Sequence, residues 1–464
     1  MRTPLKMLLV AALAASLAAA PLAGSRATGS LALPPRLDAE ILADYTSGRA
    51  IVGFDHDVTP ATIRRLAAAG ITHAVRLDTI DAVGIQGPLA AYKAIARWSD
   101  VRYVDADSPI HFDNYAAKKD THVDRVRAGK GVGGKYTGKG VTVAVIDTGV
   151  DYNHPDLADR VVRSVNFEPA WFFDMIYDGT YSDQVAEGTG NPIDSYGHGT
   201  HVAGIVAGTG AAAQGDADMS GVAPGASIAN LKIADTHQGV TCSVPCDFGW
   251  EMNALVAYEY AIEHRNDDVY PGGIRVINNS WSTFEVDSEV EPIVLIVQAA
   301  ARKGIVNVFA AGNDGPDKNT VSQGPNSLEE VITVAASCKS VDSCGEKQIA
   351  GFSSRGPQVD VAAPGDNIYS TAAASVYTPL GSHSDPNGGS DNVYYVGLSG
   401  TSMATPHISG IVALMLDANP KLTYQQVEKI LISTAVDYGE RGFDTSFGFG
   451  QVDALKAVAK AERM

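Results

Sequence analysis

Short runs of apolar and β-branched residues, separated by segments of helical length, constrain the fold of this chain most strongly. The clearest is Val141–Ile146, and similar runs lie at Ile274–Ile277, Ile305–Ala310 and Val331–Val334. Helical stretches between them are Trp250–His264 and Pro292–Lys303. Runs without alternating polar residues are typical of strands buried on both faces of a parallel sheet. The pattern predicts an α/β fold with a mainly parallel sheet flanked by helices, whose functional residues follow the carboxyl ends of strands.

A smaller unit of a different class precedes this sheet. Ala50–Phe54 is extended, and Thr59-Pro60 supplies an N-cap and a first-turn proline for a helix that stops at Gly70. The later segments are two extended runs, a helix and a last extended run: His73–Leu77, Ala82–Ile85, Pro88–Trp98 and Val101–Val104. This β-α-β-β-α-β order predicts a small α+β domain of the ferredoxin-like kind. The polar, glycine-rich stretch Asp105–Gly140 has the composition of a linker and loops.

The first thirty residues have the layout of a secretory signal peptide. Arg2 and Lys6 precede the apolar run Met7–Ala20, after which small and turn-forming residues follow. A transmembrane helix needs roughly 20 apolar residues, so this run is short for a span. We therefore expect export of the protein and three segments: residues 1–27 as signal peptide, 28–118 as an N-terminal domain, and 119–464 as the main domain.

Charge excludes one class of partner. The 464 residues include 35 basic and 53 acidic side chains, a formal net charge of −18. Binding of a polyanion needs clustered Lys and Arg, whereas no basic run here is longer than the pair Lys118 and Lys119. Nucleic acid is not expected as a partner, and no later segment is apolar enough to span a membrane.

Four cysteines form two close pairs, Cys242 with Cys246 and Cys338 with Cys344. In an exported chain such pairs predict local disulfides that staple loops. One four-cysteine zinc site is the alternative, although these spacings are not Cys-x2-Cys.

Polar residues that could carry chemistry follow the predicted strands. Asp147 comes directly after Val141–Ile146, in a position that would also suit a turn or helix cap. His198 stands in Gly-His-Gly-Thr-His, with His201 three residues later. No Glu lies between the two histidines, so a zinc site of the His-Glu-x-x-His kind is not indicated, and we expect His201 to be a packed helix residue.

Two further segments complete the set of candidates. Ser402, in Gly-Thr-Ser-Met-Ala-Thr-Pro-His, is predicted at the start of a buried helix, where free backbone N–H groups would stabilise an oxyanion, although it could also be a helix cap. Asn313, in Ala-Ala-Gly-Asn, follows a strand and is either a turn residue or a neutral donor toward developing negative charge.

The motifs Asp-Thr-Gly, Gly-His-Gly-Thr-His-Val-Ala-Gly, Ala-Ala-Gly-Asn and Gly-Thr-Ser-Met-Ala-Thr-Pro-His, in this order, closely resemble the subtilase family of serine peptidases. The order Asp, His, Ser is that of subtilisin, a known example. The resemblance runs from about Thr121 to the C-terminus, and the N-terminal unit is similar in position and pattern to the family's inhibitory propeptide.

The resemblance implies roles for four residues. Ser402 would be the nucleophile, His198 the general base, and Asp147 the residue that orients the imidazole. Asn313 would donate to the oxyanion. A secreted serine endopeptidase made as a self-processed precursor is then expected, acting on peptides or proteins, inhibited by its own propeptide, and monomeric. A catalytically silent relative and an esterase of the α/β-hydrolase kind are the alternatives; no Gly-x-Ser-x-Gly elbow surrounds Ser402.

The resemblance also places substrate-binding residues. Ser280, Trp281 and Ser282 are similar to the segment that pairs with an extended substrate, and Ala310, Ala311 and Gly312 would help to wall the pocket for the residue before the scissile bond. Ser282 stands where the family more often has Gly. Paired acids are absent around Ser282, and Asp314 and Glu285 alone do not restore a dibasic specificity.

Metal ions are not expected in the chemistry, but the resemblance allows a structural calcium ion. Asp156 lies where many family members have a ligand, and Asp216 and Asp218 could add carboxylates. Because Ca²⁺ needs 6 to 8 oxygens, no ligand set is predicted.

Overall fold

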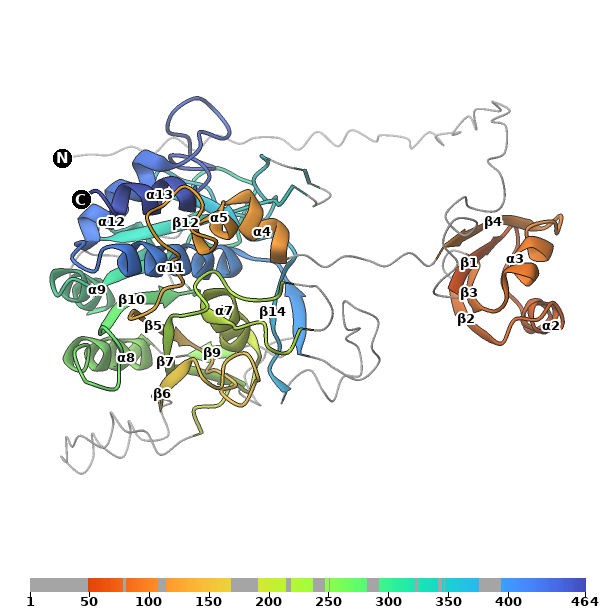
Figure 1. Ribbon diagram of the computed structural model, residues 1–464, viewed down its shortest axis with the longest axis horizontal. Helices are drawn as coiled ribbons and strands as arrows, with labels where there is room; N and C mark the ends of the chain where they lie inside the picture. Colours follow the sequence, from red (N-terminus) through yellow and green to blue (C-terminus); the bar gives the residue numbers. More distant parts are fainter. Residues whose placement is uncertain are drawn as a thin grey trace, which may run out of the picture. The chain divides into compact units, whose positions relative to one another are not determined.

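A computed structural model of the chain (Figure 1) describes residues 49–77, 81–106, 114–167, 191–213, 218–236, 247–249, 251–281, 292–321, 324–340, 344–345, 347–374 and 394–464. The chain divides into two compact units, Met1–Ser108 and Pro109–Met464. The predicted signal peptide, residues 1–27, lies outside the described residues, as do Cys242, Cys246 and Ser282.

The smaller unit has the expected order of elements. Its strands and helices are β1 Arg49–Phe54, α2 Pro60–Ala68, β2 His73–Leu77, β3 Ala82–Gln86, α3 Leu89–Ile95 and β4 Val101–Ala106. The sheet order is β2-β3-β1-β4 with antiparallel pairs, and β1 lies in the centre. Thr59 and Thr62 form a capping box that begins α2, as the Thr-Pro pair predicts. Apolar residues of strands and helices, such as Val52, Leu66 and Tyr92, form one core.

The larger unit is built on a seven-stranded parallel sheet with the order β13-β12-β11-β10-β5-β7-β6. The strands are β5 Thr142–Asp147, β6 Val161–Asn166, β7 Ser227–Lys232, β10 Ile274–Asn279, β11 Val306–Ala310, β12 Val331–Ser337 and β13 Val361–Pro364. The predicted mainly parallel α/β sheet is therefore confirmed. Sequence inspection missed β6, β7 and β13, since β6 and β7 carry polar residues such as Ser164 and Asn230 and β13 is only four residues long.

Helices cover both faces of this sheet. The side chains of β5 alternate between two hydrophobic cores, one on each face. Val143 and Val145 pack with α7 His198–Ala207 and α11 Thr401–Ala418. Ala144 and Ile146 pack on the opposite face with α8 Glu251–Glu263 and α9 Pro292–Arg302. In Figure 1, α11 crosses the sheet on the side away from α8.

Shorter elements complete the larger unit. They are α4 Asn114–Asp120, α5 Val123–Arg127, β8 Ala234–Thr236, β9 Asp247–Gly249, η3 Pro325–Ser327, β14 Ile368–Thr371, β15 Tyr395–Leu398, α12 Tyr424–Thr434 and α13 Ala454–Ala461. Strand β14 pairs with β15, and β8 pairs with β9, each antiparallel. None of the helices in the described part of the chain has the length and hydropathy that a membrane crossing requires.

Helix α4 belongs to the larger unit. The Lys118 side chain is buried, and its ammonium group lies 2.8 Å from the Asp218 carboxylate and donates to the Ser220 carbonyl at 2.7 Å. Thr121 is also buried and lies 2.8 Å from Nε2 of His407. The division at Ser108 thus precedes the predicted segment boundary at Lys118 by ten residues.

Candidate active site

The candidate site lies where the strand order reverses. From β5 the chain passes to β6 at one edge and returns to β7 between them, and then β10, β11, β12 and β13 extend the sheet on the other side. The carboxyl ends of β5 and β10 therefore flank a switch point, which is the usual ligand position in an open parallel sheet. Asp147 is the last residue of β5, and Ser280 and Trp281 directly follow β10.

Asp147 and His198 are hydrogen-bonded to each other. The Oδ1 atom of Asp147 lies 2.8 Å from Nδ1 of His198 and accepts a second hydrogen bond from the Thr148 amide at 2.8 Å. Asp147 is buried, whereas one fifth of the His198 side chain is exposed. A buried carboxylate that accepts from Nδ1 fixes the imidazole tautomer in which Nε2, facing away from Asp147, is a proton acceptor.

A second buried carboxylate, Asp194, holds this pair together. It accepts five hydrogen bonds, from the Thr148 hydroxyl, the Tyr196 and Gly197 amides, and both the amide and hydroxyl of Thr200. Burial raises the pKa of Asp194, and these hydrogen bonds act in the opposite direction. Asp194 thus joins the end of β5 to the first turn of α7. Sequence inspection missed it, although an Asp four residues before His198 is a recognisable helix-start signal.

Two glycines explain the Gly-His-Gly sequence. Gly197 precedes α7 with φ 102°, a left-handed conformation that favours glycine. A Cβ atom at Gly199 would lie 2.1 Å from the Gly149 carbonyl oxygen and 3.1 Å from Asp147 Oδ1. Only glycine at 199 therefore lets α7 approach β5 closely enough for His198 to reach Asp147.

Ser402 is the second residue of α11, at the N-terminal end that the sequence predicts. Its hydroxyl donates to the Ser280 carbonyl at 3.0 Å, and the Ser280 hydroxyl donates back to the Ser402 carbonyl at 2.9 Å. Ser280 follows β10, and the neighbouring Trp281 indole donates to the Ile146 carbonyl at 2.9 Å. These contacts bring together the N-terminus of α11 and the carboxyl ends of β10 and β5.

Asn313 lies beside the same helix terminus. Its Oδ1 atom accepts from the Thr401 amide at 2.9 Å and from the Thr401 hydroxyl at 3.1 Å. With the oxygen committed to Thr401, the side-chain nitrogen faces the other way. The position that a Cβ atom of residue 400 would take lies 3.6 Å from the Ser402 amide nitrogen and 3.7 Å from Asn313 Nδ2. Both donors therefore border one small space next to Gly400, a suitable place for an anion.

The residues predicted to wall the substrate pocket differ in burial and in the contacts they make. Ala310 and Ala311 are buried, and the Gly312 amide donates to the Thr401 hydroxyl at 3.2 Å. The Trp281 ring packs edge-on against Phe309 and is partly buried. Ser280 is buried. Ser282 and Glu285 lie outside the described residues.

His201 is a packed residue, as predicted. It is fully buried, its Nε2 lies 3.0 Å from the carbonyl oxygens of both Ile368 and Val396, and burial lowers its pKa to about 3. The neutral ring therefore donates Nε2–H to these carbonyls, and that nitrogen cannot bind zinc.

The two described carboxylates considered for calcium do not fit a cation. Asp156 accepts hydrogen bonds from the Gly210 and Ala212 amides and the Tyr395 hydroxyl at 2.8 to 3.0 Å. Asp218 forms a salt bridge with Lys118. Donors and a cation already satisfy both groups, so we assign no calcium site to them. Asp216 lies outside the described residues.

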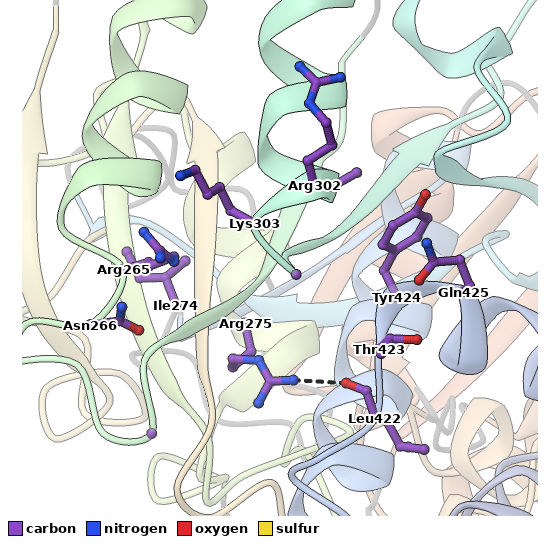
Figure 2. Close-up of a pocket in the computed structure, with 13 residues that line it drawn as sticks. Arg265, Asn266, Ile274, Arg275, Arg302, Lys303, Leu422, Thr423, Tyr424 and Gln425 are labelled. Carbon is purple, nitrogen blue, oxygen red and sulfur yellow. Dashed lines mark hydrogen bonds between the residues drawn. The ribbon is translucent and has the colours of Figure 1, made fainter.

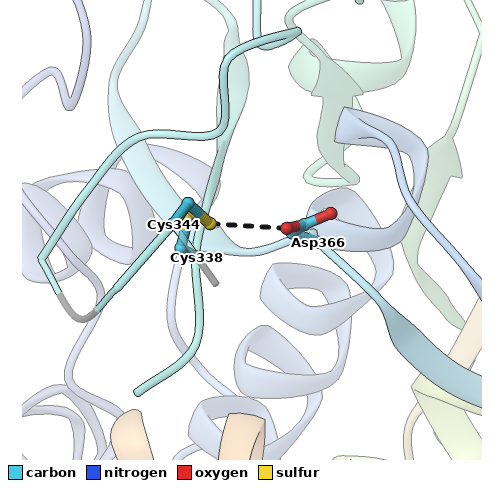
Figure 3. Close-up of side chains that lie close together, drawn as sticks. All are labelled: Cys338, Cys344 and Asp366. Carbon is cyan, nitrogen blue, oxygen red and sulfur yellow. Dashed lines mark hydrogen bonds between the residues drawn. A yellow bond between two sulfur atoms is a disulfide. The ribbon is translucent and has the colours of Figure 1, made fainter. Parts of the chain in front are cut away.

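Cysteine chemistry likewise leaves no metal site among the described residues. Cys338, Cys344 and Asp366 are the one group there with three possible ligand atoms within 4.8 Å of one another, shown in Figure 3. The two sulfurs form a disulfide, as predicted, and so are not free to bind a metal. The pair Cys242 and Cys246 falls in the undescribed part of the chain.

A separate pocket of about 860 Å³ lies at the amino-terminal end of β10, between the starts of β10 and α12 (Figure 2). Arg265, Arg275, Arg302 and Lys303 line it, and the Arg275 guanidinium donates to the carbonyls of Pro420 and Leu422. None of the candidate catalytic residues contributes to its wall.

Comparison with known proteins agrees with this geometry. A sequence model of the subtilase family matches residues 138–450. The serine protease AprX of Bacillus subtilis (strain 168) is 33% identical over 80% of this chain and 77% of its own. Fervidolysin of Fervidobacterium pennivorans is 33% identical over 68% of this chain and 40% of its own, and subtilisin E of B. subtilis (strain 168) is 32% identical over 79% and 78%.

Proposed function

The chain belongs to the subtilase family and is a serine-type endopeptidase, and from this premise we propose that Ser402, His198 and Asp147 hydrolyse peptide bonds through an acyl-enzyme. The chemistry of subtilases needs no cofactor. The observation that carries the assignment of residues is the 2.8 Å hydrogen bond between Asp147 and His198 at the switch point of the sheet.

In the proposed reaction, the Ser402 hydroxyl turns from the Ser280 carbonyl and attacks the scissile carbonyl carbon while Nε2 of His198 takes its proton. Asp147 keeps the Nδ1–H oriented and stabilises the imidazolium. The tetrahedral oxyanion enters the space next to Gly400, where Asn313 Nδ2 and the Ser402 amide donate to it. The imidazolium then protonates the leaving amine. In the second half of the reaction, water attacks the acyl-enzyme while His198 takes its proton, and His198 then returns that proton to Ser402 as the acid product leaves.

Active-site labelling tests the nucleophile. The mature protein is treated with a serine-directed phosphonylating reagent, and the label is located by peptide mass. We expect label on Ser402 together with loss of peptide cleavage, and neither label nor cleavage in Ser402→Ala. Ser433→Ala, at the exposed end of α12, is the matched control and should keep both. Full activity of Ser402→Ala would contradict the assignment, and an unlabelled, inactive wild type would support the silent-relative alternative.

We propose that the substrate lies extended along the segment Ser280–Ser282, with Ala310–Gly312 as the facing wall. Ser280 directly follows β10 and Ala310 ends the adjacent parallel strand β11, which supports this arrangement. Pairing of an extended peptide with such edges would use backbone hydrogen bonds and leave specificity to the pocket. A peptide-library cleavage profile tests it: a profile confined to dibasic sites would contradict the expectation drawn from the missing paired acids.

Export and self-processing complete the proposal. Residues 1–27 would direct secretion, and residues 28–118 would act as a folding aid and inhibitor of a monomeric enzyme. The independent core of the smaller unit supports a separable segment. Refolding of the main domain with and without the N-terminal unit tests its role, and equal yields would contradict it. N-terminal sequencing of the secreted protein gives the cleavage position, and sedimentation gives the oligomeric state.

A further inference from the structure

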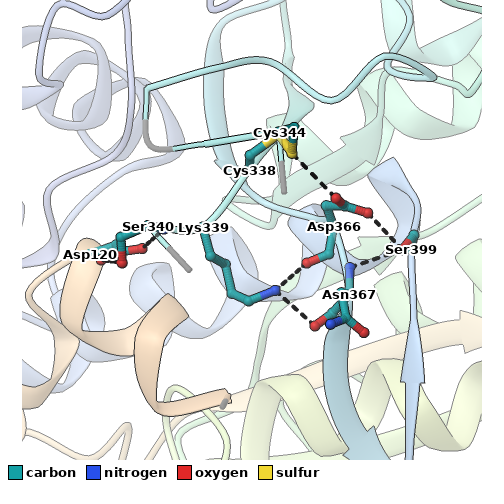
Figure 4. Close-up of a disulfide and its surroundings, with 8 residues drawn as sticks. All are labelled: Asp120, Cys338, Lys339, Ser340, Cys344, Asp366, Asn367 and Ser399. Carbon is teal, nitrogen blue, oxygen red and sulfur yellow. Dashed lines mark hydrogen bonds between the residues drawn. A yellow bond between two sulfur atoms is a disulfide. The ribbon is translucent and has the colours of Figure 1, made fainter. Parts of the chain in front are cut away.

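We propose that Lys339 is a positioning residue for the nucleophile, acting through the Asp366–Asn367 turn on the loop that precedes Ser402. The inference rests on the proposed role of Ser402. Lys339 lies outside the catalytic motifs, directly after Cys338 and beyond the end of β12. Figure 4 shows its side chain pointing toward Asp366 and Asn367, with the disulfide nearby on the Asp366 side.

The Lys339 ammonium is buried and bound by backbone oxygens. The residue is 1% exposed, and its Nζ donates to the carbonyl of Asp366 and, at 2.8 Å, to that of Asn367. A buried ammonium is costly unless its hydrogen bonds are made, so these two carbonyls must stay turned toward it. Asn367 has φ 48°, a conformation that non-glycine residues rarely adopt and that the surrounding contacts have to hold.

The Asp366–Asn367 turn also holds residues 399–400, the loop that precedes the nucleophile. The Ser399 hydroxyl donates to the Asp366 carboxylate at 2.8 Å and accepts from the Asn367 amide at 2.8 Å. The Gly400 amide donates to the Gly365 carbonyl, also at 2.8 Å. Three hydrogen bonds therefore join residues 365–367 to residues 399–400, and α11 with Ser402 begins at the next residue.

The disulfide supports the same turn from the side of β12. The Cys338–Cys344 bond brackets Lys339 in the sequence, and Cys344 Sγ lies 3.4 Å from the Asp366 carboxylate. The Gly365 amide also donates to the Ser337 carbonyl at 2.9 Å. Lys339 is thus anchored at its backbone by a covalent staple while its charged end fixes the turn.

Loss of the ammonium should act on chemistry more than on binding. Without Nζ, the two carbonyls of the turn lose their donor, and residues 399–400 lose a rigid support. A small shift of a reacting group can slow a reaction about 100-fold even when substrate still binds. The hydrogen bonds of the Lys339 ammonium go to the Asp366–Asn367 turn, so its loss should leave the Michaelis constant near wild type.

The experiment compares two cationic side chains that each donate to two backbone carbonyls. Lys339→Met removes the ammonium at the nucleophile loop, and Arg275→Met removes a partly buried guanidinium that binds the carbonyls of Pro420 and Leu422 instead. For each mature enzyme, the second-order rate of phosphonylation at Ser402, kcat and KM are measured at a temperature where circular dichroism shows the variants folded. We expect Lys339→Met to lower phosphonylation and kcat by about tenfold or more with KM within about twofold, and Arg275→Met to leave all three near wild type.

A surface variant keeps the test open if Lys339→Met does not fold. Ser399 is exposed, and Ser399→Ala removes two of the three hydrogen bonds between turn and loop without touching the buried lysine. It should lower phosphonylation by about threefold to tenfold, and the double variant should be no slower than Lys339→Met alone because both act on one contact path.

The outcomes separate two failures. Wild-type phosphonylation rates in Lys339→Met or Ser399→Ala, or equal losses in Lys339→Met and Arg275→Met, would overturn the positioning role while Ser402 stays the labelled nucleophile. Absence of label on Ser402 in the wild-type enzyme would overturn the proposed function itself, and this inference with it.

Discussion

The two units of the molecule differ in where they keep their charges. Among the described residues of the smaller unit, the buried side chains are apolar except for Thr62, and Asp100 pairs with Arg65 and His56 at the surface. The larger unit buries charged side chains in its interior: Lys118, Asp147, Asp151, Asp156, Asp194, Lys232, Lys339 and Asp453. Burial of a charge is unfavourable unless hydrogen bonds replace its water.

This difference separates two kinds of substitution. The smaller unit has an apolar core, and its described ion pairs lie toward the surface. In the larger unit, some interior charges hold elements next to the candidate site, as Asp194 does for α7. Substitutions of the buried groups at the site should therefore affect catalysis, whereas substitutions of charged groups away from it, in either unit, should affect stability alone.

The largest effect is expected when a substitution at Asp147 breaks the buried hydrogen-bond network. Asp147→Asn replaces the carboxylate that accepts from His198 Nδ1, so the ring can take the wrong tautomer. We expect kcat to fall on the order of 10⁴-fold with little change in KM. Steady-state kinetics on a peptide substrate measures it, with the exposed Asp159→Asn as control. A loss smaller than tenfold would show that Asp147 does not orient the base.

Asn313→Ala should have the next largest effect. Removal of one oxyanion donor costs on the order of 3 kcal/mol in the transition state, which is roughly a 10²-fold to 10³-fold loss in kcat. KM should stay near wild type, because the contact forms only as charge develops. Asn266→Ala, in the pocket at the amino-terminal end of β10, is the control. A rise in KM with unchanged kcat would argue instead for a role in substrate binding.

Asp360 tests whether a partly buried carboxylate away from the candidate site acts on stability alone. Burial raises its pKa to about 7, although the Thr333 amide donates to it. Because the folded state holds this proton more tightly than the unfolded chain, the stability it contributes is present below pH 4 and is lost as pH rises through 7. In a Ser402→Ala background, which prevents autolysis, Asp360→Asn should add about 2 kcal/mol at pH 8 relative to pH 4.

Denaturant unfolding at pH 4 and pH 8 measures this difference. Because Asn keeps an acceptor for the Thr333 amide, the substitution isolates the charge. A change in stability that is the same at both pH values would contradict the account, and so would a change in kcat of Asp360→Asn in the active enzyme.

The smallest effect is expected in the smaller unit. Hydrogen bonding from Arg65 is the main cause that lowers the pKa of Asp100 to about 2. The stability from this group is therefore present above pH 4 and lost as pH falls through 2. Since the pair is at the surface, Asp100→Asn in the full-length Ser402→Ala protein should cost only about 0.2–1 kcal/mol at pH 7. Denaturant unfolding measures it, and a loss above about 2 kcal/mol would show that the unit relies on its ion pairs.

Local patterns explain why much of the fold could be predicted. Val141–Ile146 is apolar except for Thr142, as is typical of a strand buried on both faces, and the Thr59 side chain caps α2 at its start. The strands β6 and β7 escaped prediction because Ser164 and Asn230 interrupt their apolar pattern. These two side chains are hydrogen-bonded to each other across adjacent strands, a partner that no local window reveals.

The sequence by itself determined the fold class, the candidate residues and the order in which they occur, because strand periodicity, helix starts and the motif glycines are local properties. Tertiary structure alone decided which groups meet. The sequence offered Asp156 as a possible calcium ligand and Asp218 as a further carboxylate, yet Asp156 accepts protein donors and Asp218 pairs with Lys118. Lys339 carried no motif, and its importance arises from carbonyls 27 and 28 residues away. Contacts over such separations depend on how helices and loops pack on the sheet, which residue order does not state.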